Sequence, residues 1–214
     1  MTTNSLRSLL AAINDPFVGV CQSLRVSANT LSLCSLAFAA LAGIAYCLSA
    51  GNRLALAIAL LCVLLNAFLD GLDGAVARRT GTNSSLGDFM DHVIDRYADV
   101  FIVCGILLGG YLRADLGVVV IAGVLLVSYL GTQAQAVGVG RVYGGVMGRA
   151  DRLIVVLLAT CVNLAYPAEI GVPGVSFTVL GWALLLIGAL SHVTALQRIW
   201  YTRQALLDPK NNKK

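Results

Sequence analysis

Residues 70–95 read DGLDGAVARRTGTNSSLGDFMDHVID, and this stretch decides the fold. It carries four aspartates at fixed spacings, Asp70, Asp73, Asp91 and Asp95. An apolar run flanks it on each side, LALAIALLCVLLNAFL at 54–69 and VFIVCGILLGG at 100–110. Carboxylates at the end of a membrane-length apolar run are costly to place there and are usually functional. We therefore expect the rest of the chain to form a scaffold, or a pocket, around these four side chains.

The composition is that of a membrane protein. The chain has 214 residues, of which 58% are hydrophobic and only 12% are charged, whereas about 25% of an ordinary soluble domain is charged. Its 22 glycines suit packed membrane helices, because small residues let backbones approach closely. We expect a single membrane domain over residues 1–205 and a disordered basic tail over 206–214. This tail is expected to meet anionic lipid and not nucleic acid.

Hydropathy predicts an all-α integral membrane protein with six transmembrane helices. The expected spans are roughly 30–50, 53–78, 86–110, 116–138, 150–167 and 176–200. Residues 1–26 repeat apolar side chains at helical spacing but are too polar to span, which predicts an N-terminal amphipathic helix in the membrane interface. A helix packed on the protein explains this segment equally well.

The basic residues predict the orientation of the chain. Most of the 15 Lys and Arg residues fall on alternate connections and on the tails. By the positive-inside rule, both termini and the connection at 79–86 then face the cytoplasm, in a multi-pass protein of the cell membrane. The four aspartates lie within a few helical turns of that side.

The aspartate spacing predicts a metal site. Asp70 and Asp73 are three residues apart, and Asp91 and Asp95 are four apart, so each pair shares a helical face. Two helices joined by a short loop can aim both pairs at each other, where divalent cations would relieve the repulsion between the carboxylates. Oxygen ligands favour Mg²⁺ or Mn²⁺, and two ions about 3.5–4 Å apart can hold the attacking and leaving oxygens of a phosphoryl group.

The residues between the two pairs suit phosphate binding. Gly74 lets a ligand approach the backbone, and Arg78 can grip a phosphate oxygen with its guanidinium. The loop that follows offers hydroxyl groups, including that of Ser84. Asp88 and Asp99 are interpreted as a capping acid and a helix-pairing acid.

The pattern D-x2-D-G-x2-A-R-x8-G-x3-D-x3-D is met at every fixed position between Asp70 and Asp95. It resembles the signature of the CDP-alcohol phosphotransferases, and the resemblance extends to the six-span layout. It implies that a CDP-linked lipid reacts with an alcohol acceptor, that CMP leaves, and that the enzyme is a homodimer. The resemblance implies that the metal ligands are Asp70, Asp73, Asp91 and Asp95, and that Asp95 is also the catalytic base. It implies that the CDP-lipid is contacted by Asn29, Ser32, Asp70, Gly74, Arg78 and Ser84.

A second charged group is the candidate acceptor site. Arg149, Asp151 and Arg152 begin the fifth span beside the same leaflet, and two arginines three residues apart can grip a phosphate. Gln133 in the fourth span could contact a polyol. The alternatives are membrane anchoring for the arginines and hydrogen bonding between helices for the glutamine.

The identity of the acceptor rests on a finer resemblance. The segments GTQAQAVGVGR, GRADR and DHVIDRYADVFI are most similar to archaeal members of the family. This implies CDP-archaeol as donor and inositol 1-phosphate as acceptor, giving archaetidylinositol phosphate. Glycerol 3-phosphate, serine or another alcohol would need the same chemistry. A divalent-cation transporter is the alternative from another class, but six of the 11 acidic residues lie between 70 and 99 instead of spreading through the membrane.

Overall fold

The computed structural model describes residues 15–82 and 84–208. Its helices and strands, in chain order, are α2 (Ala28–Cys47), α3 (Arg53–Thr80), α4 (Ser85–Leu108), α5 (Ala114–Ala136), α6 (Arg149–Ala165), β1 (Ile170–Val172), β2 (Val175–Phe177) and α7 (Val179–Leu207). Residues 15–23 are also helical. The predicted all-α class is confirmed, and a helix lies at each of the six expected spans.

Membrane-spanning capacity differs among these helices. In the described part of the chain, α2, α3, α5 and α7 are long and apolar enough to cross a membrane. Helix α6 has only 17 residues, and α4 carries five charged side chains between Asp88 and Asp99. The charges that suggested a site are thus what sets α4 apart from an ordinary apolar span.

The α3–α4 connection brings the two aspartate pairs together. Gly81 ends α3 in the left-handed conformation, with φ of 67°, which lets the chain reverse. Ser84 then caps α4, because its hydroxyl accepts a hydrogen bond from the backbone N–H of Gly87 at 3.0 Å. The end of α3 and the start of α4 therefore lie side by side.

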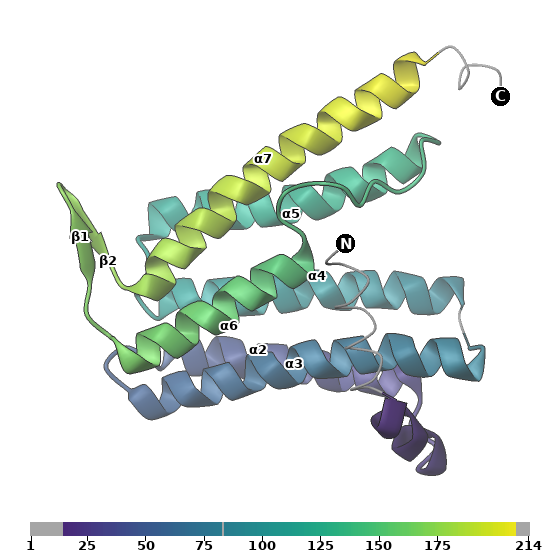
Figure 1. Ribbon diagram of the computed structural model, residues 1–214, viewed down its shortest axis with the longest axis horizontal. Helices are drawn as coiled ribbons and strands as arrows, with labels where there is room; N and C mark the ends of the chain where they lie inside the picture. Colours follow the sequence, from purple (N-terminus) through teal and green to yellow (C-terminus); the bar gives the residue numbers. More distant parts are fainter. Residues whose placement is uncertain (1–14, 83, 209–214) are drawn as a thin grey trace.

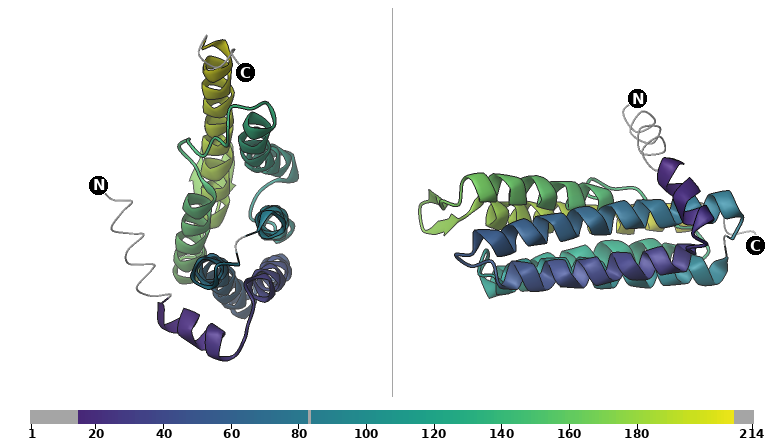
Figure 2. Two further views of the ribbon diagram at one scale, coloured as in Figure 1. Left: turned by 90° about the vertical axis from the view of Figure 1, so that its right-hand side faces the viewer. Right: turned by 90° about the horizontal axis from the view of Figure 1, so that it is seen from below.

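The helices form two packed groups (Figures 1 and 2). Helices α2, α3 and α4 pack as one bundle, α5 packs on α7, and α6 lies between α3 and α7. Contact between α2 and α4 is close enough that a Cβ at Gly105 would clash with the backbone of Gly43. Tyr46, Ile106 and Leu184 are fully buried in the core that joins the two groups.

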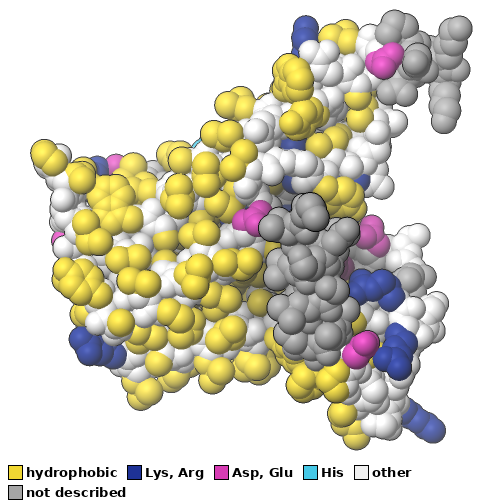
Figure 3. Space-filling model, in the orientation of Figure 1, with side chains coloured by type: hydrophobic (Ala, Val, Ile, Leu, Met, Phe, Trp, Pro, Cys, Tyr) yellow, Lys and Arg dark blue, Asp and Glu magenta, His cyan; other side chains and the backbone are white. Residues whose placement is uncertain are grey.

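The outer surface suits a lipid environment. Apolar side chains cover the outward faces of the long helices, whereas acidic and basic side chains gather mainly toward one end (Figure 3). Leu54, Ile58 and Leu61 of α3 and Leu158 of α6 are among these exposed residues. This surface, together with the four long apolar helices, is typical of a membrane protein, as the sequence predicts.

The two ends of the chain refine the sequence prediction. In the described part of the N-terminal segment, Val18 and Cys21 are buried in one cluster with Leu72 and Val76 of α3, which supports packing on the protein. Residues 1–14 and 209–214 lie outside the described residues. Helix α7 runs to Leu207, so it includes the first two residues of the expected tail.

An antiparallel hairpin precedes α7, and hydropathy alone did not predict it. Strand β1 pairs with β2 through Val172 and Val175, and the turn between them contains Pro173 and Gly174, whose φ is 87°. A Pro-Gly pair favours such a turn. The last helix consequently begins at Val179, three residues later than expected.

Candidate active site

Three of the four signature aspartates form one acidic group. Carboxylate oxygens of Asp70 on α3 and of Asp91 and Asp95 on α4 all lie within 4.8 Å of one another. The fourth, Asp73, is buried beside them and accepts a hydrogen bond of 2.5 Å from the Ser32 hydroxyl of α2. Asp70 and Asp91 still interact electrostatically with Asp73. The structure thus gathers all four aspartates, with Asp73 turned toward α2.

The acidic group fits a hard divalent cation. Its donors are carboxylate oxygens from two rigid helices, which is the ligand type that Mg²⁺ and Mn²⁺ prefer, whereas zinc sites use mainly histidine and cysteine. Among the described residues, this is the one place where three such side chains come so close. Asp70, Asp91 and Asp95 would hold the ion, with Asp73 next to them.

Arg149 at the start of α6 contacts the acidic group directly. Its Nη1 lies 2.6 Å from Asp70 Oδ2 and 2.8 Å from Asp95 Oδ1. The second oxygen of Asp95, Oδ2, lies 3.1 Å from Nη2 of Arg96. Both oxygens of the predicted catalytic base are therefore paired with arginine in this arrangement.

Arg152 is held differently, deep between α4 and α6. Its Nη2 donates a hydrogen bond of 2.7 Å to Asp99 Oδ2, and only 4% of Arg152 and 6% of Asp99 are exposed. Asp99 is thus the helix-pairing acid that the sequence suggested. Arg149 and Arg152 are neighbours on one helical face, but each is already paired with a carboxylate.

Both arginines nevertheless keep free donors. In the described residues, the buried Nε and Nη2 of Arg149 and the buried Nε and Nη1 of Arg152 have no hydrogen-bond partner. Buried donors without a partner are costly, and a bound oxyanion would satisfy them. These unpartnered guanidinium nitrogens are the kind of hydrogen-bond donor that binds a phosphate group.

The residues predicted to contact the CDP-lipid lie around the start of α2, the end of α3 and the start of α4. Asn29 is exposed in the first turn of α2, and Ser32 holds Asp73. A Cβ at Gly74 would come within 3.2 Å of the Arg78 guanidinium, so glycine gives that group room to fold back along α3. Ser84 serves as a helix cap. Their contacts with a nucleotide stay predictions.

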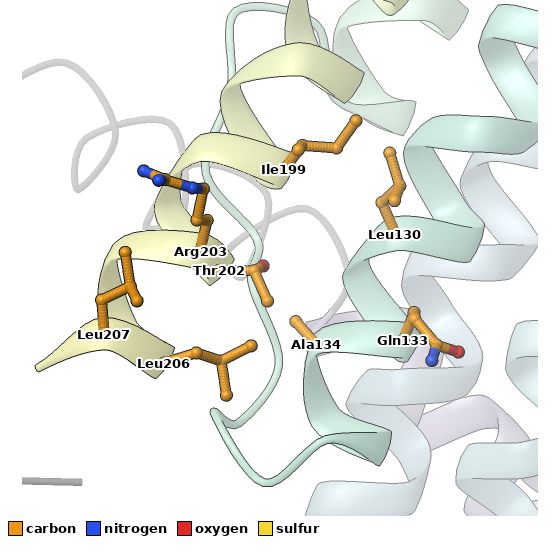
Figure 4. Close-up of a pocket in the computed structure, with 8 residues that line it drawn as sticks. All are labelled: Leu130, Gln133, Ala134, Ile199, Thr202, Arg203, Leu206 and Leu207. Atoms are coloured by element: carbon orange, nitrogen blue, oxygen red, sulfur yellow. The ribbon is translucent and has the colours of Figure 1, made fainter. Parts of the chain in front are cut away.

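The remaining predicted acceptor residues lie in other surroundings. Asp151 accepts a hydrogen bond of 2.8 Å from the N–H of Gly148, which caps α6. Gln133 lines an apolar groove of about 410 Å³ between α5 and the end of α7, which Ala134 and Leu206 also line (Figure 4). No hydrogen bond or ion pair among the described residues joins Gln133 to the acidic group. Acceptor binding by these two residues stays a prediction.

Sequence reasoning missed Arg198 of α7. Its guanidinium donates to the backbone carbonyls of Val127 at 2.6 Å, Gly144 at 3.0 Å and Tyr143 at 3.1 Å. The charges of Arg152, Arg141 and Arg96 also act on Arg198. An arginine within the last expected span was the available signal, although the positive-inside rule counts it among the cytoplasmic residues.

Helix α7 also holds the connection that leads into α6. The N–H of Met147 donates to the Thr194 hydroxyl at 2.9 Å, and the N–H of Val146 donates to Gln197 at 3.2 Å. Gly145 has a φ of 141° and lies against the Thr194 side chain. The start of α6, and with it Arg149, is therefore positioned by the last helix.

Comparisons with known proteins identify relatives. A family model described as CDP-alcohol phosphatidyltransferase matches residues 25–193. The chain is similar to archaetidylinositol phosphate synthase of Pyrococcus horikoshii, with 36% identity over 142 residues, which are 66% of this chain and 68% of that one. It is also similar to the synthase of the same name from Methanothermobacter thermautotrophicus, with 32% identity over 140 residues, which are 65% of this chain and 66% of that one.

Solved structures share the fold. A crystal structure of Mycobacterium tuberculosis phosphatidylinositol phosphate synthase with CDP-DAG bound has a TM-score of 0.71 and 21% identity, covering 95% of this chain and 98% of that one. A structure of the same protein with manganese and citrate has a TM-score of 0.71 and 22% identity, covering 94% of this chain and 92% of that one.

Proposed function

Because the chain belongs to the CDP-alcohol phosphatidyltransferase family, we propose that it joins the lipid phosphate of CDP-archaeol to inositol 1-phosphate, releasing CMP and forming archaetidylinositol phosphate. Family membership makes it a CDP-alcohol phosphotransferase of phospholipid synthesis. The names of the two archaeal relatives support the proposed substrates. The observation that carries the proposal is an acidic metal-binding group next to two arginines with unpartnered donors.

The positive charges favour a phosphorylated acceptor. Arg149 and Arg152 offer four buried guanidinium nitrogens without a hydrogen-bond partner among the described residues, and the charge of Arg198 interacts with that of Arg152. A phosphate carries up to two negative charges and can accept several of these hydrogen bonds at once, whereas an uncharged polyol cannot neutralise the arginines and the single carboxylate of serine does so less fully. This supports a phosphorylated polyol, of which inositol 1-phosphate is the proposed example.

The donor would lie along α2, α3 and α4. Asn29, Ser32, Gly74, Arg78 and Ser84 are the proposed contacts to the nucleotide. Two Mg²⁺ or Mn²⁺ ions, held by the four aspartates, would supply neutralisation of the pyrophosphate charge. Arg78 would hold a phosphate oxygen beside Gly74, where the absence of a side chain leaves space.

The chain's own residues then carry the transfer. Asp95 accepts the proton of the acceptor hydroxyl, whose oxygen attacks the phosphorus that bears the lipid. A P–O bond to the acceptor forms, and the bond between this phosphorus and the oxygen of CMP breaks, so CMP leaves with the electron pair. Orientation by rigid helices and charge stabilisation supply most of the rate.

The proposed placement follows from the same site. Helices α4 and α6 complete six spans, since Asp95 and Asp99 of α4 pair with Arg149 and Arg152 of α6 inside the bundle and not toward lipid. The acidic group lies at the cytoplasmic side of the cell membrane, where a water-soluble acceptor can enter. A homodimer is the proposed assembly, on the basis of the family resemblance.

The test is an acceptor and donor panel. The purified protein in lipid nanodiscs is given CDP-archaeol or CDP-diacylglycerol, Mn²⁺, and inositol 1-phosphate, glycerol 3-phosphate or serine in turn. CMP release and product mass identify the reaction, and a chelator should abolish it. Turnover with serine but not with inositol 1-phosphate would overturn the proposed acceptor. Mn²⁺ transport without CMP release would overturn the enzyme reading of the site.

A further inference from the structure

Arg149 takes the position of a cation in the acidic group. One nitrogen, Nη1, lies 2.6 Å from an oxygen of Asp70 and 2.8 Å from an oxygen of Asp95. A divalent ion held by Asp70 and Asp95 would need carboxylate oxygens that the guanidinium now neutralises. The guanidinium and the ion would therefore compete for the same carboxylates.

The proposed reaction needs Arg149 elsewhere. Asp95 has Arg149 Nη1 at 2.8 Å from Oδ1 and Arg96 Nη2 at 3.1 Å from Oδ2, so a positive charge beside each oxygen disfavours the transfer of a proton to it from a hydroxyl. Arg149 itself cannot give its Nη1 to a phosphate while that nitrogen neutralises Asp70 and Asp95. Proton acceptance by Asp95 and phosphate binding by Arg149 Nη1 therefore both require that Arg149 separates from Asp70 and Asp95.

The structure also shows which arginine can move. Arg149 is the first residue of α6, and its side chain is 15% exposed. Arg152, one turn later, is nearly fully buried against Asp99, a residue outside the acidic group. Breaking the Arg152 pair would leave a charge stranded in the protein interior, which is strongly unfavourable. Of the two arginines, Arg149 is therefore the one whose guanidinium can leave its carboxylate partners.

We propose that Arg149 is the resident counter-cation of the acidic group, and that a divalent ion displaces it toward the acceptor phosphate. This inference rests on the proposed function. Metal binding then comes before acceptor binding, because it releases the guanidinium that the phosphate needs and frees Asp95 Oδ1. By linkage, a phosphate that captures Arg149 strengthens metal binding by the same factor.

The first test measures the reactivity of Arg149 itself, without turnover. The full-length protein is treated with phenylglyoxal, which modifies accessible arginines, and peptides are quantified by mass spectrometry. We expect Mn²⁺ to raise labelling of Arg149 several-fold and inorganic phosphate to reverse the increase. Arg152 should stay unlabelled throughout, and exposed Arg79 should be labelled throughout. Equal labelling of Arg149 with and without Mn²⁺ would overturn the exchange.

The second test measures Mn²⁺ affinity by electron paramagnetic resonance. Removing two competing ion pairs in Arg149→Ala should tighten Mn²⁺ binding by about fivefold to thirtyfold. Arg79→Ala is the matched control, because Arg79 pairs with Asp15 at 3.6 Å and not with the acidic group. In the wild type, phosphate should tighten Mn²⁺ binding, and in Arg149→Ala this coupling should vanish.

The outcomes separate the inference from the function. Mn²⁺ binding that is unchanged in Arg149→Ala overturns the exchange, while CMP release by the wild type still supports the proposed function. Absence of CMP release with every CDP-lipid overturns the proposed function, whatever the labelling shows.

Discussion

Removing the carboxylate of Asp99 should destabilise the protein severely. In Asp99→Ala, the Arg152 guanidinium loses its 2.7 Å partner while only 4% of the residue is exposed. Leaving one member of a buried ion pair without its partner costs about 3–5 kcal/mol. For a chain of this size, each kcal/mol lowers Tm by about 2–4 °C, so the expected loss is roughly 6–20 °C.

The assay is thermal loss of helical circular dichroism in one detergent at one protein concentration. Asp88→Ala is the matched control, because its exposed carboxylate meets His92 and Arg141 only at 3.5 and 3.8 Å. Such surface pairs contribute about 0–1 kcal/mol. Adding Arg152→Met to Asp99→Ala should restore most of the stability, since an apolar pair often replaces a buried ion pair without loss. A Tm for Asp99→Ala close to that of Asp88→Ala would refute this account of the α4–α6 contact.

Three further changes test the site and the packing. Asp95→Asn should lower CMP release by about 10²–10⁴-fold while CDP-lipid binding, measured by titration, is retained, and an active variant would exclude proton transfer by this residue. Arg152→Ala strands Asp99 and should lower Tm, so KM values are measured below that Tm. There the acceptor's KM should rise more than that of the CDP-lipid, whereas equal effects would remove Arg152 from the acceptor site. Gly105→Val should cost about 1–3 kcal/mol, seen as a lower Tm, because its side chain would meet the backbone of Gly43. Gly19→Ala, which has open space around it, is the control, and equal Tm values would contradict the close contact.

The sequence predicted the parts of the site that depend on local spacing. Asp70 and Asp91 come together because helical periodicity and one short loop set their relative positions, and both features are readable from the chain. The capping of α4 by Ser84 follows from a similar local rule, whereas the partner of Asp99 lies 53 positions away in the chain.

Long-range packing explains what the sequence did not reveal. Arg149 contacts Asp70 across 79 positions of the chain, and this contact depends on how α6 docks on α3. Spacing alone indicated two arginines on one face but not the carboxylates that each would meet. Arg198 was missed for the same reason, because its carbonyl partners belong to α5 and to the connection before α6.

The grip of α7 on residues 143–147 has a consequence for biosynthesis. Thr194, Gln197 and Arg198 anchor the segment that delivers Arg149, although α7 contributes no aspartate. Once the chain has been synthesised through α6, every signature aspartate and both arginines are present. The segment that positions Arg149 still lacks its contacts with α7. We therefore expect the site to be complete only after α7 has been made and has packed against residues 143–147.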